Sequence, residues 1–288
     1  MKVIRRGTSG DVLDQRGGGG SRGGVPFAIG GGLSIPVLII AAIAYFVLGQ
    51  GGGSGFGIDM PLNQLPGAQV SGKGIPAGQD PERDQVEFVS FVLDDIQNFW
   101  TEQFQASGDR YSRAKLVLFD GQVSTACGGA TSDVGPFYCP GDQQVYIDLS
   151  FFRELSARFG APGDFAQAYV IAHEIGHHIQ LLSGISENVS RAQRKNPNDA
   201  NELSVRLELQ ADCLAGVWAY STYERQLLES GDLEEGLAAA AAVGDDRLQR
   251  QAGQRVNPET WTHGSSQDRV KWFKTGFESG RASSCDTF

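Results

Sequence analysis

One long uncharged stretch near the N-terminus divides the chain into unequal parts. Residues 25–48 contain no acidic or basic side chain and are mostly apolar. The stretch is long enough to cross a hydrocarbon core of roughly 30 Å as a helix, so it predicts one transmembrane span. A cleaved signal peptide is the alternative. It fits less well, because the stretch begins far from the N-terminus and the residues after Leu48 make a poor cleavage site.

The segment before this stretch is basic. It contains Lys2, Arg5, Arg6, Arg16 and Arg22 against Asp11 and Asp14. Since Lys and Arg are enriched on the cytoplasmic side of spans, we predict that residues 1–24 form a cytoplasmic tail. A single crossing then places the rest of the chain outside the cytoplasm, anchored in the cell membrane by residues 25–48.

The remaining chain divides into a linker and one domain. Residues 49–83 are rich in Gly, Pro and Gln and lack hydrophobic periodicity, which is typical of a flexible linker. Residues 84–288 are long enough to bury one substantial core. The net charge of −10 argues against nucleic-acid binding, because phosphate recognition needs clustered Lys and Arg.

The domain is predicted to be α+β, mainly helical with a small early β-sheet. Residues 115–119 and 144–149 are short runs of β-branched and aromatic residues, typical of strands. Apolar residues recur at helical spacing through most of the rest. The expected helices begin near Asp84 and then cover residues 151–159, 164–182, 198–229, 233–243 and 265–280.

His173, Glu174 and His177 form an H-E-x-x-H pattern inside an apolar helical segment. Four residues advance a helix by about 400°, so both imidazoles project from one face and can bind one metal ion. Glu174 lies on the flank of this face, where it can act as general base toward a metal-activated water. His178 is rotated by about 140° and is expected to face elsewhere. The pattern predicts one zinc ion per chain.

The pattern supplies two ligands and needs a third. A metzincin would have a histidine six residues after His177, where this chain has Ser183. A metzincin also needs a methionine turn, and the only methionines here are Met1 and Met60, both before the motif. That class is therefore excluded, and a carboxylate from another helix is the remaining option.

Glu208 and Asp212 supply such carboxylates on one face of a later helix. The neighbouring residues are apolar or small, and buried acids are costly unless they are paired or bound to metal. We expect Glu208 to bind zinc and Asp212 to accept a hydrogen bond from the far ring nitrogen of a ligand histidine. Glu202 is the alternative zinc ligand. If no metal binds here, the alternative is that Glu208 and Asp212 lie on a solvent-exposed acidic face of the helix.

The last histidine precedes the final helix. His263 or Arg269 could stabilise the oxyanion that forms when water adds to a carbonyl. From spacing alone, a capping and surface-charge role beside Ser265 or Ser266 fits this segment better.

The four cysteines lack the close C-x-x-C spacing of a structural zinc site. Cys127 and Cys139 flank a Gly-rich loop between the expected strands and are predicted to form a disulfide, which an extracytoplasmic compartment permits. Cys213 is expected to pair with Cys285. Buried free thiols are the alternative for both pairs.

Three phrases of the sequence, HEIGHH, ELQAD and THGSSQDRVKWF, resemble the bacterial membrane-anchored family called "putative neutral zinc metallopeptidase" and, more distantly, the gluzincins. The resemblance extends over the whole chain and includes GPFYCP, VYIDL and GDD. It implies a zincin-like fold of a gluzincin-type metalloendopeptidase in a bacterial cell membrane. It further implies zinc bound by His173, His177 and Glu208. Glu174 would be the general base, and Asp212 would contact a ligand without binding the metal.

The histidine after Thr262 resembles the transition-state loop of gluzincins, which implies catalytic roles for His263 and Arg269. The chain departs from the membrane heat-shock endopeptidases of that class. It has one expected span, and Gly264 follows the histidine where those enzymes have a proline. We therefore do not expect this chain to share the substrate preferences of those enzymes.

The predicted function is zinc-dependent hydrolysis of peptide or protein substrates. By analogy with zincins, residues 145–149 are the candidate strand edge that pairs with an extended substrate. A zinc-containing membrane scaffold that binds a partner without cleaving it is the alternative, and a hydrolase of another bond, such as one in the cell wall, is a third. Glu174 favours the enzyme, because a purely structural site needs no base.

Overall fold

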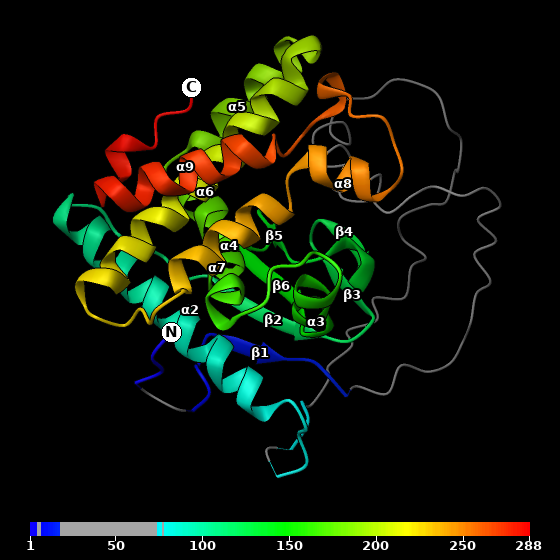
Figure 1. Cartoon of the computed structure of the whole chain (residues 1–288). Helices are drawn as coiled ribbons and strands as arrows, with labels where there is room; N and C mark the ends of the chain where they lie inside the picture. Colours follow the sequence, from blue (N-terminus) through cyan, green and yellow to red (C-terminus); the bar gives the residue numbers. More distant parts are fainter. Residues whose placement is uncertain (5–6, 18–73, 77) are drawn as a thin grey trace, which may run out of the picture.

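A four-stranded sheet forms one layer of this computed structural model, which describes residues 1–4, 7–17, 74–76 and 78–288 (Figure 1). The strand order is β1 (Val12–Asp14), β2 (Lys115–Phe119), β6 (Gln144–Asp148) and β5 (Phe137–Cys139). The first three are parallel, and β5 is antiparallel to β6. β2 and β6 are buried along almost their whole length, as central parallel strands with apolar sequences should be.

Helices make up most of the remaining described chain. A hairpin of β3 (Gln122–Thr125) and β4 (Gly128–Thr131) precedes β5. The α-helices are α2 (Arg83–Ala106), α3 (Ser150–Ala157), α4 (Asp164–Leu182), α5 (Ile185–Lys195), α6 (Ala200–Glu224), α7 (Asp232–Ala242), α8 (Asp245–Gln251) and α9 (Ser266–Ser279). Short 3-10 turns cover Ser132–Val134, Pro197–Asp199, Pro258–Thr260 and Ala282–Ser284. The predicted mainly helical α+β domain is confirmed.

Helix α4 is the centre of the domain. It contacts α2, α5, α6, α7 and β5, and in Figure 1 it lies between the sheet and the layer of α6, α7 and α9. Its residues are apolar on nearly every side, which is the composition that a helix buried on all faces requires. The H-E-x-x-H residues are therefore placed inside the molecule rather than on a surface helix.

Glycines allow α6 to approach its two neighbours closely. A Cβ on Gly176 of α4 would lie 3.0 Å from the Cα of Ala211 in α6. On the other side of α6, a Cβ on Gly276 of α9 would collide with the carbonyl oxygen of Cys213. The three helix backbones can pack this tightly because glycine has no side chain. This packing brings polar residues from α4, α6 and α9 into one buried layer.

Both predicted disulfides are present. Cys127–Cys139 ties the β3–β4 hairpin to β5, and Cys213–Cys285 joins α6 to the C-terminal residues. Each bond closes a loop and so restricts the unfolded chain, the second over a sequence separation of 72 residues.

Residues 7–17 differ from the predicted separate tail, because β1 extends the sheet by pairing with β2. Arg16, which follows β1, is fully buried and bonds to Asp14, Asp80 and Glu82. The three carboxylates make burial of the guanidinium tolerable. The structure therefore places residues 7–17 against the sheet of the domain.

The predicted span at residues 25–48 and most of the predicted linker at residues 49–83 lie outside the described residues. Within the described ranges, none of the helices combines the length and apolar character needed to cross a bilayer.

Most predicted helix ends agree closely with the structure, and one differs. The long helix expected over residues 198–229 ends at Glu224. Gln226 adopts a positive φ of 57°, which turns the chain so that Leu227 is buried. The helix thus ends before Leu227, which packs into the core, although the helical spacing of apolar residues in the sequence continues.

Candidate metal centre

His173 and His177 of α4 meet Glu208 of α6 where the two helices cross. Their candidate ligand atoms all lie within 4.8 Å of one another. Nε2 of His173 is 3.1 Å from Oε2 of Glu208, and Nε2 of His177 is 3.4 Å from Oε1. Two ligand atoms bound to one tetrahedral zinc ion at about 2.0–2.1 Å lie roughly 3.3 Å apart. The spacing and the donor types of this set fit zinc.

The charges around the three residues favour a cation. Burial disfavours the charged form of His173, but the neighbouring carboxylate of Asp212 outweighs this effect and raises the pKa of His173 to about 10. Burial also opposes ionisation of Glu208, yet the charges of His177 and His263 hold its pKa well below the ordinary value. The set therefore stabilises positive charge among its donor atoms, whether a proton or a metal ion supplies it.

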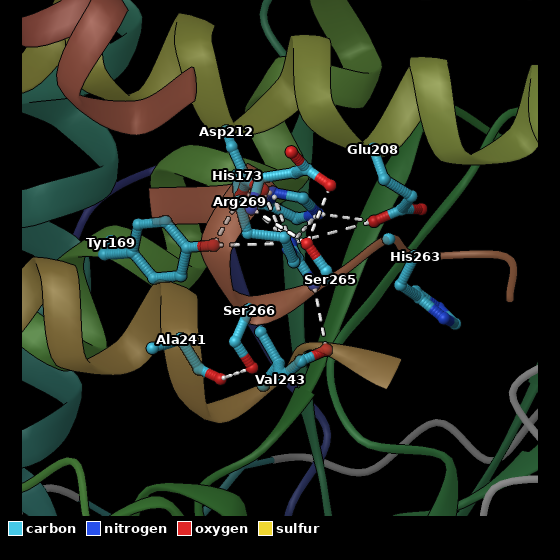
Figure 2. A network of polar contacts seen from close by, with 12 residues as sticks. Tyr169, His173, Glu208, Asp212, Ala241, Val243, His263, Ser265, Ser266 and Arg269 are labelled. Carbon is cyan, nitrogen blue, oxygen red and sulfur yellow. Dashed lines mark hydrogen bonds and ion pairs between the residues drawn. The ribbon is translucent and has the colours of Figure 1, made fainter. Parts of the chain in front are cut away.

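Asp212 orients His173 from behind (Figure 2). Because an ionised carboxylate only accepts hydrogen bonds, Nδ1 of His173 donates to Oδ1 of Asp212, at 2.9 Å. This bond leaves Nε2 as the ring nitrogen that faces Glu208. Asp212 is fully buried, and it also accepts a hydrogen bond from the hydroxyl of Tyr169. The predicted pairing of Asp212 with a candidate ligand histidine is thus found in the structure.

Arg269 of α9 completes the support of Asp212. Its Nε and one terminal nitrogen donate to the two carboxylate oxygens at 2.7 and 2.9 Å. Its other terminal nitrogen donates to the carbonyl of Val243 at 3.2 Å. Arg269 is only 2% exposed. Arg269 therefore mainly supports Asp212 behind His173, but its terminal nitrogen Nη2 also lies 3.4 Å from Nε2 of His173 and 3.8 Å from Oε2 of Glu208.

Glu174 lies on α4 next to the two histidines and is buried. Burial raises its pKa above the ordinary value, and the nearby charges of His173 and His177 only partly oppose this shift. A carboxyl group whose pKa is raised toward neutrality can both accept and return a proton.

His263 is held by Asp245, a residue that the sequence analysis did not single out. Oδ1 of Asp245 lies 3.2 Å from Nδ1 of His263. Its Oδ2 accepts the backbone N–H groups of Thr262, His263 and Gly264 at 2.9, 2.7 and 3.0 Å. Figure 2 shows His263 beside Glu208 at the edge of the network. The only signal for Asp245 in the sequence was its place in the GDD phrase.

His178 and Glu202, which the sequence analysis also considered, have partners outside the set of candidate ligands. Nε2 of His178 donates to the carbonyl of Ser112 at 2.6 Å, and its Nδ1 accepts from the hydroxyl of Tyr138 at 2.8 Å. Glu202 is exposed and pairs with Arg206 at 2.5 Å. Glu208, and not Glu202, is the carboxylate that faces the two histidines.

The predicted substrate edge at residues 145–149 is wrong. Residues 144–148 form β6, which lies between β2 and β5 and is paired on both sides. Its backbone groups are already used by its neighbours, so it has no edge to offer. The edge strand on this side of the sheet is β5, which also contacts α4.

Similar proteins are known from several bacteria. The "Uncharacterized protein YpfJ" of Escherichia coli K12 is 45% identical over 292 residues, covering 100% of this chain and 99% of that protein. The "Uncharacterized protein Rv2575" of Mycobacterium tuberculosis H37Rv is 51% identical over 189 residues, covering 62% of this chain and 63% of that protein. No solved structure matches the chain. Residues 1–288 match one protein family throughout, and the chain therefore belongs to the family described as "Putative neutral zinc metallopeptidase".

Proposed function

We propose that this chain is a zinc-dependent peptidase of the gluzincin type, with one zinc ion bound by His173, His177 and Glu208. The observation that carries the proposal is the approach of both Nε2 atoms to one carboxylate, at 3.1 and 3.4 Å. Zinc with three protein ligands supplies a Lewis acid with an open position, which polarises a carbonyl and makes water more acidic.

Glu174 acts as the general base in this proposal. It takes a proton from the water that attacks the scissile carbonyl and passes the proton to the leaving amine. Its position beside the ligands, its burial and its raised pKa support this role. No side chain attacks the substrate, so hydrolysis proceeds without an acyl-enzyme.

His263 donates a hydrogen bond to the oxyanion. The support for this role is Asp245, which occupies Nδ1 and leaves Nε2 for the substrate. Arg269 and Asp212 act as positioning residues, since their bonds orient His173. An extended peptide substrate pairs with the edge strand β5, because β5 is the strand that adjoins α4.

Residues 25–48 attach the chain to a membrane, supported by their length and lack of charge. The two disulfides suit a domain outside the cytoplasm. Because β1 pairs with β2, we place residues 7–17 on the same side of the membrane as the domain, and not in the cytoplasm as the sequence suggested.

The function is tested by hydrolysis of casein with the full-length, zinc-loaded chain. We expect Glu174→Gln and chelation each to abolish cleavage, with zinc still bound by the variant. Glu187→Gln, which alters an exposed carboxylate on α5, serves as the matched control and retains activity. Equal rates for wild type and Glu174→Gln, with zinc bound to both, would leave the zinc-containing scaffold as the better account.

A further inference from the structure

We propose that Gln180 sets the tautomer of His177, and that Gln210 and the disulfide-anchored C-terminal residues help the carbonyl of Leu207 to hold Gln180 in the required orientation. The proposal rests on the metal site proposed above and assigns positioning roles to Gln180, Gln210 and the carbonyl of Cys285. Two of these three residues lie on α4 and α6, and the third lies beyond α9.

A continuous series of hydrogen bonds leads from His177 to Cys285. Nδ1 of His177 lies 2.9 Å from Oε1 of Gln180. Nε2 of Gln180 donates to the carbonyl of Leu207 at 2.7 Å and to Oε1 of Gln210 at 3.1 Å. Nε2 of Gln210 donates to the carbonyl of Cys285 at 2.9 Å. Gln180, Gln210 and Cys285 are 0%, 7% and 2% exposed, so water competes little for these bonds.

The direction of the series is fixed at its far end. A backbone carbonyl can only accept, so Gln210 must point its amide nitrogen at Cys285 and its oxygen at Gln180. Gln180 must then present its nitrogen to Gln210, and the carbonyl of Leu207 requires the same orientation. The oxygen of Gln180 therefore faces His177, and Nδ1 of His177 must carry the proton.

This tautomer is the one that a metal ligand needs. With the proton on Nδ1, Nε2 of His177 has a free lone pair, and this is the atom 3.4 Å from Glu208. If Gln180 were reversed, its nitrogen would face Nδ1 and favour the proton on Nε2, where it blocks a metal ion. His173 obtains the same tautomer from the charged Asp212, whereas His177 obtains it from neutral amides.

The disulfide holds the last acceptor in place. Cys285 is bonded to Cys213, which follows Gln210 by three residues in α6. The hydroxyl of Thr287 also donates to the carbonyl of Arg206 at 2.8 Å, so residues on both sides of Gln210 fasten the C-terminal segment to α6. Without the disulfide, the carbonyl of Cys285 can leave Gln210, whose amide is then free to reverse.

Zinc affinity of the full-length chain, measured by competition with a chelator, tests the proposal. We expect Gln180→Leu to weaken binding by about ten- to a hundredfold, the usual effect of removing the partner of a ligand histidine. Gln210→Leu and the double variant Cys213→Ser, Cys285→Ser should weaken it by a smaller factor, because the carbonyl of Leu207 still orients Gln180.

Two matched controls separate this effect from general damage to the fold. Gln193→Leu removes another buried glutamine that donates to a backbone carbonyl, that of Ala200. Cys127→Ser, Cys139→Ser removes the other disulfide. Both controls should bind zinc as tightly as the wild type.

A spectroscopic readout is independent of activity and of metal. Nitrogen-15 NMR of the imidazole rings in the zinc-free chain reports the tautomer at a pH high enough for His177 to be neutral, and only four histidines contribute signals. We expect the Nδ1–H form for His177 in the wild type and a mixture in Gln180→Leu. Gln180→Glu should restore the Nδ1–H form, because its carboxyl group still accepts from His177.

Stoichiometric zinc binding by the wild type tests the metal site itself, apart from the role of the glutamines. The proposal is overturned if Gln180→Leu keeps both the Nδ1–H form and wild-type zinc affinity. The part played by the disulfide is overturned if the Cys213 and Cys285 double variant binds zinc as tightly as the Cys127 and Cys139 control.

Discussion

The Cα of Ala211 lies only 3.0 Å from the point where a Cβ on Gly176 would stand. This contact sets how closely α4 and α6 cross, and the candidate ligands come from both helices. We expect Gly176→Ala to push the helices apart by a few tenths of an ångström and to weaken zinc binding. The measurement is zinc affinity, with Gly129→Ala as the control because no atom lies within 4 Å of its new Cβ.

Gly176→Ala also distinguishes an effect on the packing of α4 against α6 from an effect on the helix propensity of α4. Alanine favours a helix over glycine by about 1 kcal/mol, so the zinc-free variant can be as stable as the wild type. Wild-type zinc affinity in Gly176→Ala would show that the crossing distance does not control the site.

Arg269 neutralises a carboxylate that has no access to solvent. Arg269→Met keeps much of the volume but removes both hydrogen bonds that Arg269 donates to buried Asp212, which then has His173 as its remaining charged partner. Removing one partner of such a pair typically costs about 3–5 kcal/mol. We expect a loss of this size in the free energy of unfolding, measured by urea in the presence of chelator. Arg250→Met, which breaks an exposed pair with Asp246, should cost less than about 1 kcal/mol. Equal losses in the two variants would contradict the role given to Arg269.

His263 should contribute to the rate and not to metal binding. We expect His263→Phe to lower kcat by about 10²–10³-fold, as removal of one oxyanion donor does, with KM changed far less. Asp245→Asn should lower kcat less, because an amide oxygen can still accept from the loop. Kinetics on a chromogenic peptide, with zinc content measured in parallel, test this pair. Loss of zinc from His263→Phe would place His263 among the ligands instead.

His178 makes stability depend on pH. Burial lowers the pKa of His178, and its bond to the carbonyl of Ser112 only partly opposes this shift. Above about pH 6.5 both the folded and the unfolded state are neutral at this residue. As the pH falls below that value, the unfolded chain takes up the proton first, and the free energy of unfolding decreases.

The test compares urea unfolding of the zinc-free wild type and His178→Gln at pH 7.5 and 5.5. We expect the variant to lose less stability between these two pH values, because the other histidines contribute equally to both proteins. An identical decrease in both proteins would mean that His178 is not kept neutral by the fold.

The position of residues 7–17 can be tested in intact cells. Ile4 and Tyr223 are 73% and 58% exposed, so a cysteine at either position should react with a membrane-impermeant thiol reagent if it faces outward. We expect both single variants to be labelled from the outside. Labelling of Tyr223→Cys alone would place the N-terminal segment across the membrane from the domain and would exclude the pairing of β1 with β2.

Elements with continuous local patterns were predicted well from the sequence. Lys115–Phe119 and Asp164–Leu182 have the predicted bounds, because an unbroken apolar run or helical period identifies them. The strands β1 and β5 were missed, since three residues carry no periodicity. Helix α5 was also missed, since it is short and mostly polar.

The site shows the same division between local and long-range information. The spacing of His173 and His177, and that of Glu208 and Asp212, follows from helix geometry alone. The bonds of Asp245 to His263 and of Gln210 to Cys285 join residues 18 and 75 positions apart. They depend on how helices pack, which no local pattern encodes.

The pairing of β1 with β2 has a consequence for how the chain folds. Val12 and its partner Leu116 are about a hundred residues apart in the sequence, so closing this pair is slow. Until it closes, the apolar sequence KLVLF has a bare edge that can pair with another molecule. A truncated chain that begins at residue 84 would keep that edge permanently and should aggregate. Residues 7–17 therefore protect the sheet against aggregation.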